Sequence, residues 1–238
     1  MEQGNKDRSL VSKVMDGLVT GIVEEKYGAI LPPQDVLSKD FDVSRTVMRE
    51  ALSMLLARDM LDVRPKIGTR IRPMHDWRMI DEDVVNWRFR AKPDPLFLRD
   101  VIEFRILIEP RASAQAAARG TAADIAAIRD AFDTLCAIRP GEPGYQAADE
   151  LLHTRIVMAS GNQFFQQMAA IIRGALAAVN PIVNQKAGVW ESVMRTHGRV
   201  VEAIERRDPK EAEAASLALI DYTVDEVGNA FAVDPPHR

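Results

Sequence analysis

The 238-residue chain carries 31 Lys and Arg residues against 35 Asp and Glu, a net charge of −4, and it is long enough for two domains with separate cores. Its single cysteine, Cys136, excludes an internal disulfide framework and suits a reducing compartment. No uncharged apolar run approaches the roughly 18 residues of a membrane span, and the N-terminus lacks a signal-peptide core, so we expect a cytoplasmic protein without a membrane segment.

An amphipathic helix is predicted for residues 9–27, because apolar residues recur along it at four-residue spacing. Those residues are Leu10, Val14, Leu18 and Ile22. Gly28 is expected to end this helix. The helix would pack behind the two that follow and complete a small three-helix bundle.

The stretch over residues 31–57 predicts a helix, a tight turn at Asp42-Val43 and a second helix for which Ser44 is a suitable N-cap. Apolar residues at three- and four-residue spacing give the second helix one buried face. Its first turn exposes Arg45, Thr46 and Arg49 on the other side. Because a helix in the major groove presents its N-terminal residues to bases and phosphates, this pattern favours DNA binding. A plain helical hairpin with two surface arginines is the alternative.

Residues 61–73 have β-strand composition interrupted by Pro65-Lys66 and Gly68, which predicts two short strands around a tight tip. Residues 43–73 hold seven basic and three acidic side chains, a local charge of +4 in an acidic protein. A basic patch of this kind is an electrostatic footprint for phosphate. The sequence therefore predicts a winged helix-turn-helix.

We assign this winged helix-turn-helix domain to residues 1–75. Residues 76–95 are expected to form a linker that contains one short helix. Trp77, Trp87 and Phe89 in this linker indicate that it docks on a neighbouring domain rather than moving freely.

Residues 96–232 are Ala-rich, with few strand formers, and predict an all-α antiparallel bundle of about six helices. Thr121 is expected to cap the second of these helices, with Asp124 in the capping-box position. Asn180-Pro181 predicts a kink or break at the end of a later helix. Residues 233–238 form a frayed tail. The expected fold class is mainly α, with the winged helix-turn-helix followed by the bundle.

Arg105 lies in the first long helix of this bundle, between Phe104 and Ile106, on an element expected to line the core. A buried guanidinium is costly unless it is paired. Its partner is either Glu109, four residues along the helix, or the carboxylate of a bound ligand, which arginine can clamp with two hydrogen bonds.

The pattern GxxLPxxxxLxxxFxVSRxxxREAL…L, followed by a glycine-bearing wing, resembles the GntR family of bacterial transcription regulators. The matching residues are Gly28, Leu31, Pro32, Leu37, Phe41, Val43, Ser44, Arg45, Arg49, Glu50, Ala51, Leu52, Leu55 and Gly68. The helical second half resembles the FadR-type FCD effector domain of that family. It matches at Arg105, Glu109-Pro110, Asp149, His153, Ser160-Gly161-Asn162 and His197. The linker also looks like that of the subgroup controlling sugar-acid catabolism, such as galactonate-operon regulators.

The resemblance implies a one-component regulator that binds a palindromic operator in double-stranded DNA. It would bind as a homodimer, because two recognition helices must meet half-sites at a fixed separation. DNA-contacting roles carry over to Ser44, Arg45, Thr46, Arg49, Lys66 and Gly68. One departure is Asp35, where family members often have Arg or Ser, so a phosphate contact sometimes made there is expected to be lost or altered.

The resemblance also implies that a small carboxylate, of the sugar-acid class, binds in the bundle as effector. Repression that the ligand relieves is the commoner arrangement in such families. The residues expected to contact the effector are Arg105, Asp149, His153, Asn184 and His197. Effector and operator would then affect each other's binding reciprocally.

The resemblance to this type of effector domain implies a metal site made of one Asp and three His. In this chain the last His position is occupied by Leu219, which leaves Asp149, His153 and His197. Asp149 and His153 are four residues apart and share one helix face, whereas His197 must come from another helix. Three ligands with open positions suit one divalent metal, Zn or Ni. A hydrogen-bonded Asp–His pair without metal is the alternative.

Two other functions are considered for a helical domain of this kind. A metal-dependent enzyme acting on a small organic acid is not expected, because the chain lacks HExxH, a Gly-rich phosphate loop and a Ser or Cys nucleophile with an obvious base. An architectural DNA-binding protein without a ligand would have a solid apolar bundle centre. The four polar residues Arg105, Asp149, His153 and His197 argue against that.

Overall fold

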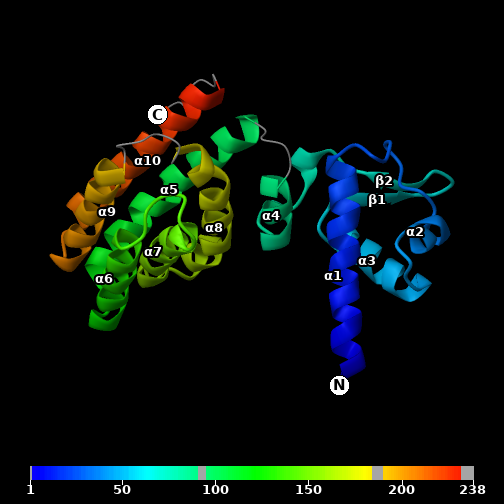
Figure 1. Cartoon of the computed structure of the whole chain (residues 1–238), viewed down its shortest axis with the longest axis horizontal. Coiled ribbons are helices and arrows are strands. Elements are labelled where there is room, and N and C mark those ends of the chain that lie inside the picture. The colour runs from blue at the N-terminus through cyan, green and yellow to red at the C-terminus, as the bar shows by residue number, and fades with distance from the viewer. Residues whose placement is uncertain (1, 91–94, 184–189, 232–238) are drawn as a thin grey trace. The chain divides into compact units, whose positions relative to one another are not determined.

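The computed structural model describes the backbone of residues 2–90, 95–183 and 190–231 (Figure 1). The chain divides into two compact units, Met1–Lys92 and Pro93–Arg238. Helices occupy most of the described residues, and the strands among them form one small sheet, which confirms the prediction of a mainly α protein. None of the described helices combines the length and the apolar character that crossing a membrane requires.

The first unit is a three-helix bundle with a β hairpin and one further helix, and it confirms the predicted winged helix-turn-helix. Its elements are α1 (Glu2–Val23), α2 (Gln34–Asp40), α3 (Arg45–Ala57), β1 (Leu61–Arg64), β2 (Gly68–Ile71), a 3-10 turn (Met74–Asp76) and α4 (Glu82–Arg90). One apolar core joins them, and Leu18 of α1, Leu37 of α2 and Leu55 of α3 are fully buried in it.

The connection between α2 and α3 is the tight turn that the sequence predicts. Asp42 adopts the left-handed conformation (φ 50°), which Asp tolerates better than most residues, and the Val43 N–H donates to the Ser38 carbonyl at 3.0 Å. The Ser44 hydroxyl then accepts a hydrogen bond from the Val47 N–H at 3.2 Å. This N-cap determines where α3 begins and therefore which residues occupy its first turn.

Helix α1 ends earlier than the sequence predicts, at Val23 instead of residue 27. Glu25 adopts a left-handed conformation (φ 57°), and the Lys26 N–H donates to the Gly21 carbonyl at 2.8 Å. This Schellman-type hydrogen bonding satisfies the last carbonyls of the helix. The predicted stop at Gly28 is therefore wrong, because the backbone has already turned at Glu25.

The wing is an antiparallel pair of strands in which Arg64 lies opposite Gly68. At its tip, Lys66 (φ 65°) and Gly68 (φ 111°) have left-handed backbone conformations, and the second is one that favours glycine. The segment ahead of α2 extends the sheet, because Ile30 forms a bridge with Arg70. The wing is thereby attached to the helix-turn-helix on its β2 side.

Helix α4, which lies in the segment expected to be a linker, packs on the first unit. Val84 and Trp87 are buried in the same core as α1 and α3, and the Trp87 Nε1–H donates to Asp16 Oδ1 at 2.6 Å. The division of the chain into compact units accordingly places α4 with the first unit. The expectation that the tryptophans dock this segment on a domain agrees with these contacts, whereas the boundary at residue 75 excludes a helix that belongs to this core.

A half-buried arginine also connects α4 to the end of α3. Arg58, the C-cap residue of α3, forms ion pairs with Asp81 at 3.1 Å and Asp83 at 2.6 Å. Its guanidinium carbon lies 5.9 Å from the centre of the Trp87 ring. The helix that carries the candidate DNA contacts and the helix that leads out of the unit are therefore linked directly.

The second unit is a bundle of six helices in its described residues, in agreement with the prediction. The helices are α5 (Pro95–Arg119), α6 (Ala122–Cys136), α7 (Tyr145–Ala159), α8 (Gln163–Val183), α9 (Trp190–Glu205) and α10 (Pro209–Phe231). Helix α5 contacts α7, α8, α9 and α10, so it is the central helix of the bundle (Figure 1).

The start of α6 agrees with the sequence prediction, whereas the end of α8 differs from it. Thr121 and Asp124 form the predicted capping box at the start of α6, with reciprocal hydrogen bonds of 3.1 and 2.9 Å. Of the kink or break predicted at residues 180–181, the break is wrong, because α8 continues to Val183. Burial of Leu176 and Val179 against the bundle supports this last part of the helix despite the proline.

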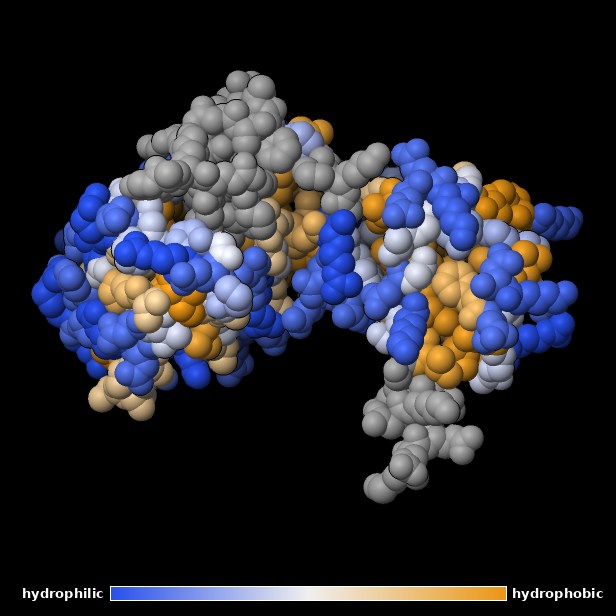
Figure 2. All heavy atoms as spheres, viewed as in Figure 1, coloured by the Kyte–Doolittle hydropathy of each residue, from blue (hydrophilic) through white to orange (hydrophobic). Residues whose placement is uncertain are grey.

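Both units carry a mixed surface. On the face shown in Figure 2, hydrophilic residues surround smaller hydrophobic areas. Isolated exposed apolar residues are common on folded proteins and by themselves indicate no function.

Candidate functional site

The first candidate site is the exposed face of the helix-turn-helix and wing. Ser44, Arg45, Thr46 and Arg49 occupy the start of α3 and are all exposed, while Val47 and Met48 between them are buried. Lys66 and Gly68 at the tip of the wing are exposed as well. The six positions assigned to DNA contact are therefore all accessible, and those on α3 lie opposite its buried face.

The positive charge of this region is less available than the sequence count indicates. Arg64 pairs with Asp62 at 2.7 Å, and Arg45 pairs with Asp35 at 2.9 Å. Arg58 and Arg72 likewise form ion pairs with acidic side chains of the first unit. Among the described residues of the predicted DNA-binding set, Arg49 and Lys66 are the cations without such a pair. The free positive charge is thus concentrated on α3 and at the wing tip.

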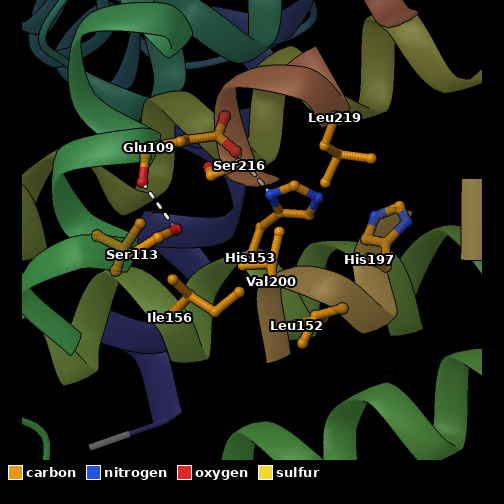
Figure 3. Close-up of a pocket in the computed structure, with 10 residues that line it drawn as sticks. Glu109, Ser113, Leu152, His153, Ile156, His197, Val200, Ser216 and Leu219 are labelled. Atoms are coloured by element: carbon orange, nitrogen blue, oxygen red, sulfur yellow. Dashed lines mark hydrogen bonds and ion pairs between the residues drawn. The ribbon is translucent and has the colours of Figure 1, made fainter. Parts of the chain in front are cut away.

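The second candidate site lies at the centre of the helical bundle (Figure 3). Asp149 and His153 on α7 meet His197 on α9, and all three residues are at most 5% exposed. His197 Nε2 lies 3.3 Å from Asp149 Oδ1, and His153 Nε2 lies 3.9 Å from the same oxygen. The three residues predicted from the sequence are therefore brought together by the fold.

Both imidazole rings are oriented through their Nδ1 atoms. His197 Nδ1 lies 2.9 Å from the Val193 carbonyl oxygen, and His153 Nδ1 lies 2.7 Å from Glu109 Oε2. Since a carbonyl and a carboxylate accept hydrogen bonds, each Nδ1 carries the proton. Each Nε2 atom then faces Asp149, and His197 Nε2 has no hydrogen-bond partner in the described part of the chain.

This donor set fits a metal ion. Donor atoms around tetrahedral Zn²⁺ at bond lengths of about 2.0–2.1 Å lie about 3.3 Å apart. The Asp149–His197 distance of 3.3 Å has this value, and the Asp149–His153 distance of 3.9 Å requires only a small adjustment. Histidines whose second nitrogen is held by a carboxylate or a carbonyl are typical of metal sites.

Glu109 is the residue that the sequence analysis underestimated. The sequence offers it as one of two candidate partners of Arg105 and as part of the FCD resemblance, and the structure confirms that pair, with Arg105 Nε 2.5 Å from Glu109 Oε1. The other carboxylate oxygen contacts His153, a residue 44 positions away. Ser113, four residues after Glu109, donates its hydroxyl hydrogen to the Glu109 carbonyl at 2.9 Å. The four-residue spacing of Arg105, Glu109 and Ser113 on one helix face is the signal that could have identified them as a group.

Electrostatic interactions stabilise the ionised form of Glu109. Burial alone would raise the pKa of Glu109, but the Arg105 guanidinium and His153 outweigh burial and hold that pKa well below its usual range. Burial likewise would lower the pKa of His153, and the Glu109 carboxylate reverses this and raises it. Glu109 is therefore an anion that holds both Arg105 and His153.

A small cavity adjoins the histidines. It has a volume of about 10 Å³, and residues of four helices line it: Glu109, Ser113, Leu152, His153, Ile156, Val157, His197, Val200, Ser216 and Leu219. Leu219 closes the side next to both histidines (Figure 3), so the position that the resemblance assigns to a third histidine provides no ligand. Ser113 and Ser216 are buried lining residues that the sequence analysis did not identify.

Of the predicted effector contacts, His153 and His197 line this cavity, whereas Asp149 is not among the lining residues. Arg105 is 2% exposed and is not among the lining residues, because Glu109 is the member of their pair that reaches the wall. Its predicted internal pairing is therefore what the structure contains. Asn184 lies outside the described residues.

Comparisons with known proteins identify both units. The FCD domain family matches residues 100–222, and the gntR family of bacterial regulatory proteins matches residues 10–71. The galactonate operon transcriptional repressor of Escherichia coli (strain K12) is 28% identical over 203 residues, covering 84% of this chain and 88% of the relative. The putative L-lactate dehydrogenase operon regulatory protein of the same strain is 27% identical over 222 residues, covering 90% and 85%.

The fold has solved counterparts as well. The structure of Lar, which is described as controlling expression of the Listeria monocytogenes agr system, matches with a TM-score of 0.63 at 14% identity, over 92% of this chain and 96% of Lar. At this identity the likeness shows the shared fold. The matched families and relatives are transcriptional regulators, so the protein is a regulator and not an enzyme. The chain belongs to the GntR family of DNA-binding bacterial transcription regulators and carries an FCD domain in its second unit.

Proposed function

We propose that this regulator is a homodimeric repressor whose operator binding is controlled by a small carboxylate, of the sugar-acid class, bound in the second unit. The observation that carries the proposal is the buried group of Asp149, His153 and His197 in a largely apolar bundle. Burying three such polar groups lowers the stability of the fold unless they form hydrogen bonds or bind a ligand or metal ion. Apolar residues would fill a bundle centre that had only a structural role.

A divalent metal, Zn or Ni, is part of this proposal. Asp149, His153 and His197 would hold it, and the bound ion would supply a Lewis-acid centre with coordination positions that the protein does not fill. Leu219 leaves one side of the site without a protein donor. A carboxylate oxygen of the effector suits that position, because carboxylates are metal ligands.

Effector binding requires the bundle to change shape. The cavity of about 10 Å³ has room for about one water molecule, whereas pockets for small organic ligands measure about 300–1,000 Å³. A sugar acid can therefore bind only to a widened form in which the helices lining the cavity have moved apart. A ligand that binds one form selectively shifts the equilibrium towards it, and operator binding responds if the two forms differ in DNA affinity.

The names of the relatives support a carboxylate effector. One relative is named for a galactonate operon and another for an L-lactate dehydrogenase operon. Galactonate and lactate are both hydroxy-carboxylates. A carboxylate next to a hydroxyl group can chelate a divalent ion through two oxygens, which agrees with a site of three protein ligands and open positions.

Operator recognition is assigned to the first unit. Ser44, Arg45, Thr46 and Arg49 at the start of α3 would contact the major groove, and Lys66 and Gly68 would place the wing against the backbone. Repression is tested with a reporter promoter that carries an operator selected by the full-length protein from random duplexes. We expect low expression with the regulator and high expression after the effector is added. Higher expression caused by the regulator alone would identify an activator.

A thermal-shift experiment tests the effector site. The purified protein is heated with each member of a panel of sugar acids and short carboxylates, with and without chelator. A ligand that binds only the folded state stabilises it by about 2.7 kcal/mol at a hundred times its Kd. We expect one sugar acid to raise Tm selectively and chelator to remove that increase. If no acid shifts Tm and chelator has no effect, both the metal and the sugar-acid assignment are wrong.

Two histidine variants provide a matched comparison. His197 is buried in the site, whereas the His75 side chain is 83% exposed in the first unit. Elemental analysis should find metal in the wild type and in His75→Ala but not in His197→Ala, with helix content checked by circular dichroism. Metal retained in a folded His197→Ala variant would exclude His197 as a ligand.

A further inference from the structure

The first turn of α2 makes two contacts with the first residue of α3. Asp35 Oδ2 accepts a hydrogen bond from Arg45 Nη2 at 2.9 Å, and Gln34 Nε2 donates one to the Arg45 carbonyl at 2.9 Å. The Arg45 and Asp35 side chains are 76% and 58% exposed. The ion pair therefore lies on the solvent side of the helix-turn-helix, at the turn of α3 that is assigned to DNA.

Neither the stability of the fold nor affinity for DNA explains why the Asp35 carboxylate lies beside Arg45. An ion pair so exposed contributes little to folding. A negative charge on a DNA-facing surface repels phosphates and lowers affinity for every sequence. What the contact does supply is a defined orientation for Arg45, since a guanidinium is planar and engaging one Nη restricts the direction of its remaining donors.

We propose that Asp35 is a positioning residue for sequence recognition, which holds Arg45 for a guanine base edge and keeps it from the phosphate backbone. A guanidinium held in one plane suits the two-bond contact with guanine O6 and N7, the commonest specific contact in the major groove. The Asp35 charge weakens the attraction of Arg45 to phosphate more than its hydrogen bonds to neutral guanine acceptors. This inference rests on the proposed contact between Arg45 and DNA.

Arg49, one turn further along α3, offers a comparison within the same helix. It is exposed on the same side and has no ion pair within the described ranges. An arginine without a fixed partner retains its full charge and rotational freedom, which suits a phosphate contact. The two arginines would then divide the work, with Arg45 providing specificity and Arg49 affinity.

Selection from random DNA duplexes tests the proposal. The full-length wild type, Asp35→Asn and Asp40→Asn are each used to enrich a random duplex library, and base frequencies are compared at every position. Asp40→Asn is the matched control, because it removes the same charge from the exposed C-terminal end of the same helix, while the ion pair of Arg45 is with Asp35. We expect Asp35→Asn to lose a guanine preference at one base pair of each half-site, and Asp40→Asn to keep the wild-type profile.

Binding measurements give the second readout. Removing one negative charge near the backbone should steepen the salt dependence by about one phosphate contact, which makes binding of a scrambled duplex about five- to tenfold tighter near 0.1 M salt. The ratio of specific to non-specific affinity should fall about tenfold or more for Asp35→Asn. An unchanged base profile, or equal gains for both duplexes, would overturn the role given to Asp35.

Arg45→Ala separates failure of this inference from failure of the proposed DNA contact. If Arg45→Ala binds the enriched duplex as the wild type does, Arg45 does not contact DNA and both ideas are wrong. If Arg45→Ala weakens binding but Asp35→Asn keeps the wild-type profile, only the inference about Asp35 is wrong. In the Arg45→Ala background, Asp35→Asn is expected to change the base profile no further.

Discussion

Glu109→Gln removes the one anion that holds both Arg105 and His153 in the core of the second unit. The Arg105 and Glu109 side chains are 2% and 4% exposed, and the charged atoms are 2.5 Å apart. The substitution preserves the shape of the side chain and removes its charge. Arg105 then remains buried without a counter-ion among the described residues, and His153 loses the acceptor that orients its ring.

The expected cost follows from the burial of this pair. Removing one partner of a buried ion pair typically lowers the free energy of unfolding by about 3–5 kcal/mol, because the remaining charge is uncompensated. In a unit of this size each kcal/mol corresponds to about 2–4 °C in Tm, so Glu109→Gln should lower Tm by about 10 °C. An exposed ion pair provides the contrast, since its loss usually costs about 0–1 kcal/mol.

Urea denaturation followed by circular dichroism measures this difference, in the presence of chelator so that bound metal makes no contribution. Glu213→Gln is the matched control. Glu213 on α10 pairs with Arg111 on α5 at 3.3 Å, and both side chains are exposed. Hydrogen exchange of peptides from α5 and α7 should locate the loss in the second unit. If Glu109→Gln lowers the free energy of unfolding no more than Glu213→Gln does, Glu109 is not the counter-ion of Arg105.

Three other substitutions test local features of both units. Arg49→Ala should weaken operator binding by about 1–3 kcal/mol with helix content unchanged, and wild-type affinity in a gel-shift titration would exclude a contact there. Ser44→Ala removes the N-cap of α3 and should lower the free energy of unfolding of the first unit by about 1 kcal/mol in urea, unless the cap hydrogen bond is absent in solution. Hydrogen bonds from Arg129 lower the pKa of Glu205 from its usual 4.5, so the stability this pair contributes is present above that pH and lost as the pH falls further. The stability difference between wild type and Glu205→Gln should therefore shrink on acidification, and a difference independent of pH would contradict the pairing.

The features that were predicted well depend on residues close together in the chain. The Ser44 N-cap and the capping box of Thr121 and Asp124 are interactions over three residues, and the structure contains both. The burial of one face of α3 follows from three- and four-residue spacing alone. Helix ends were less reliable, since α1 ends at Val23 and the chain turns at Glu25 through backbone hydrogen bonds that no side-chain pattern indicates.

The sequence predicted which residues form the candidate site, but it did not predict the hydrogen bonds that join them across helices. The four-residue spacing of Asp149 and His153 indicated a shared face, and the resemblance to the FCD domain added His197. The bond between Glu109 and His153 joins residues 44 positions apart, and the bond between Trp87 and Asp16 joins residues 71 positions apart. Such contacts depend on how two helices cross, which the spacing within either helix does not determine.

The sequence by itself determined the two-part plan of this protein: a winged helix-turn-helix with arginines at the start of its second helix, then a helical bundle with a few polar residues inside. Local hydrogen bonding and apolar periodicity are sufficient for that, because they act within one or two helical turns. The tertiary structure decided which charges are paired. It placed Asp35 on Arg45 and joined Glu109, the partner of Arg105 within α5, to His153 of α7, since only packing brings side chains of different helices within hydrogen-bonding distance.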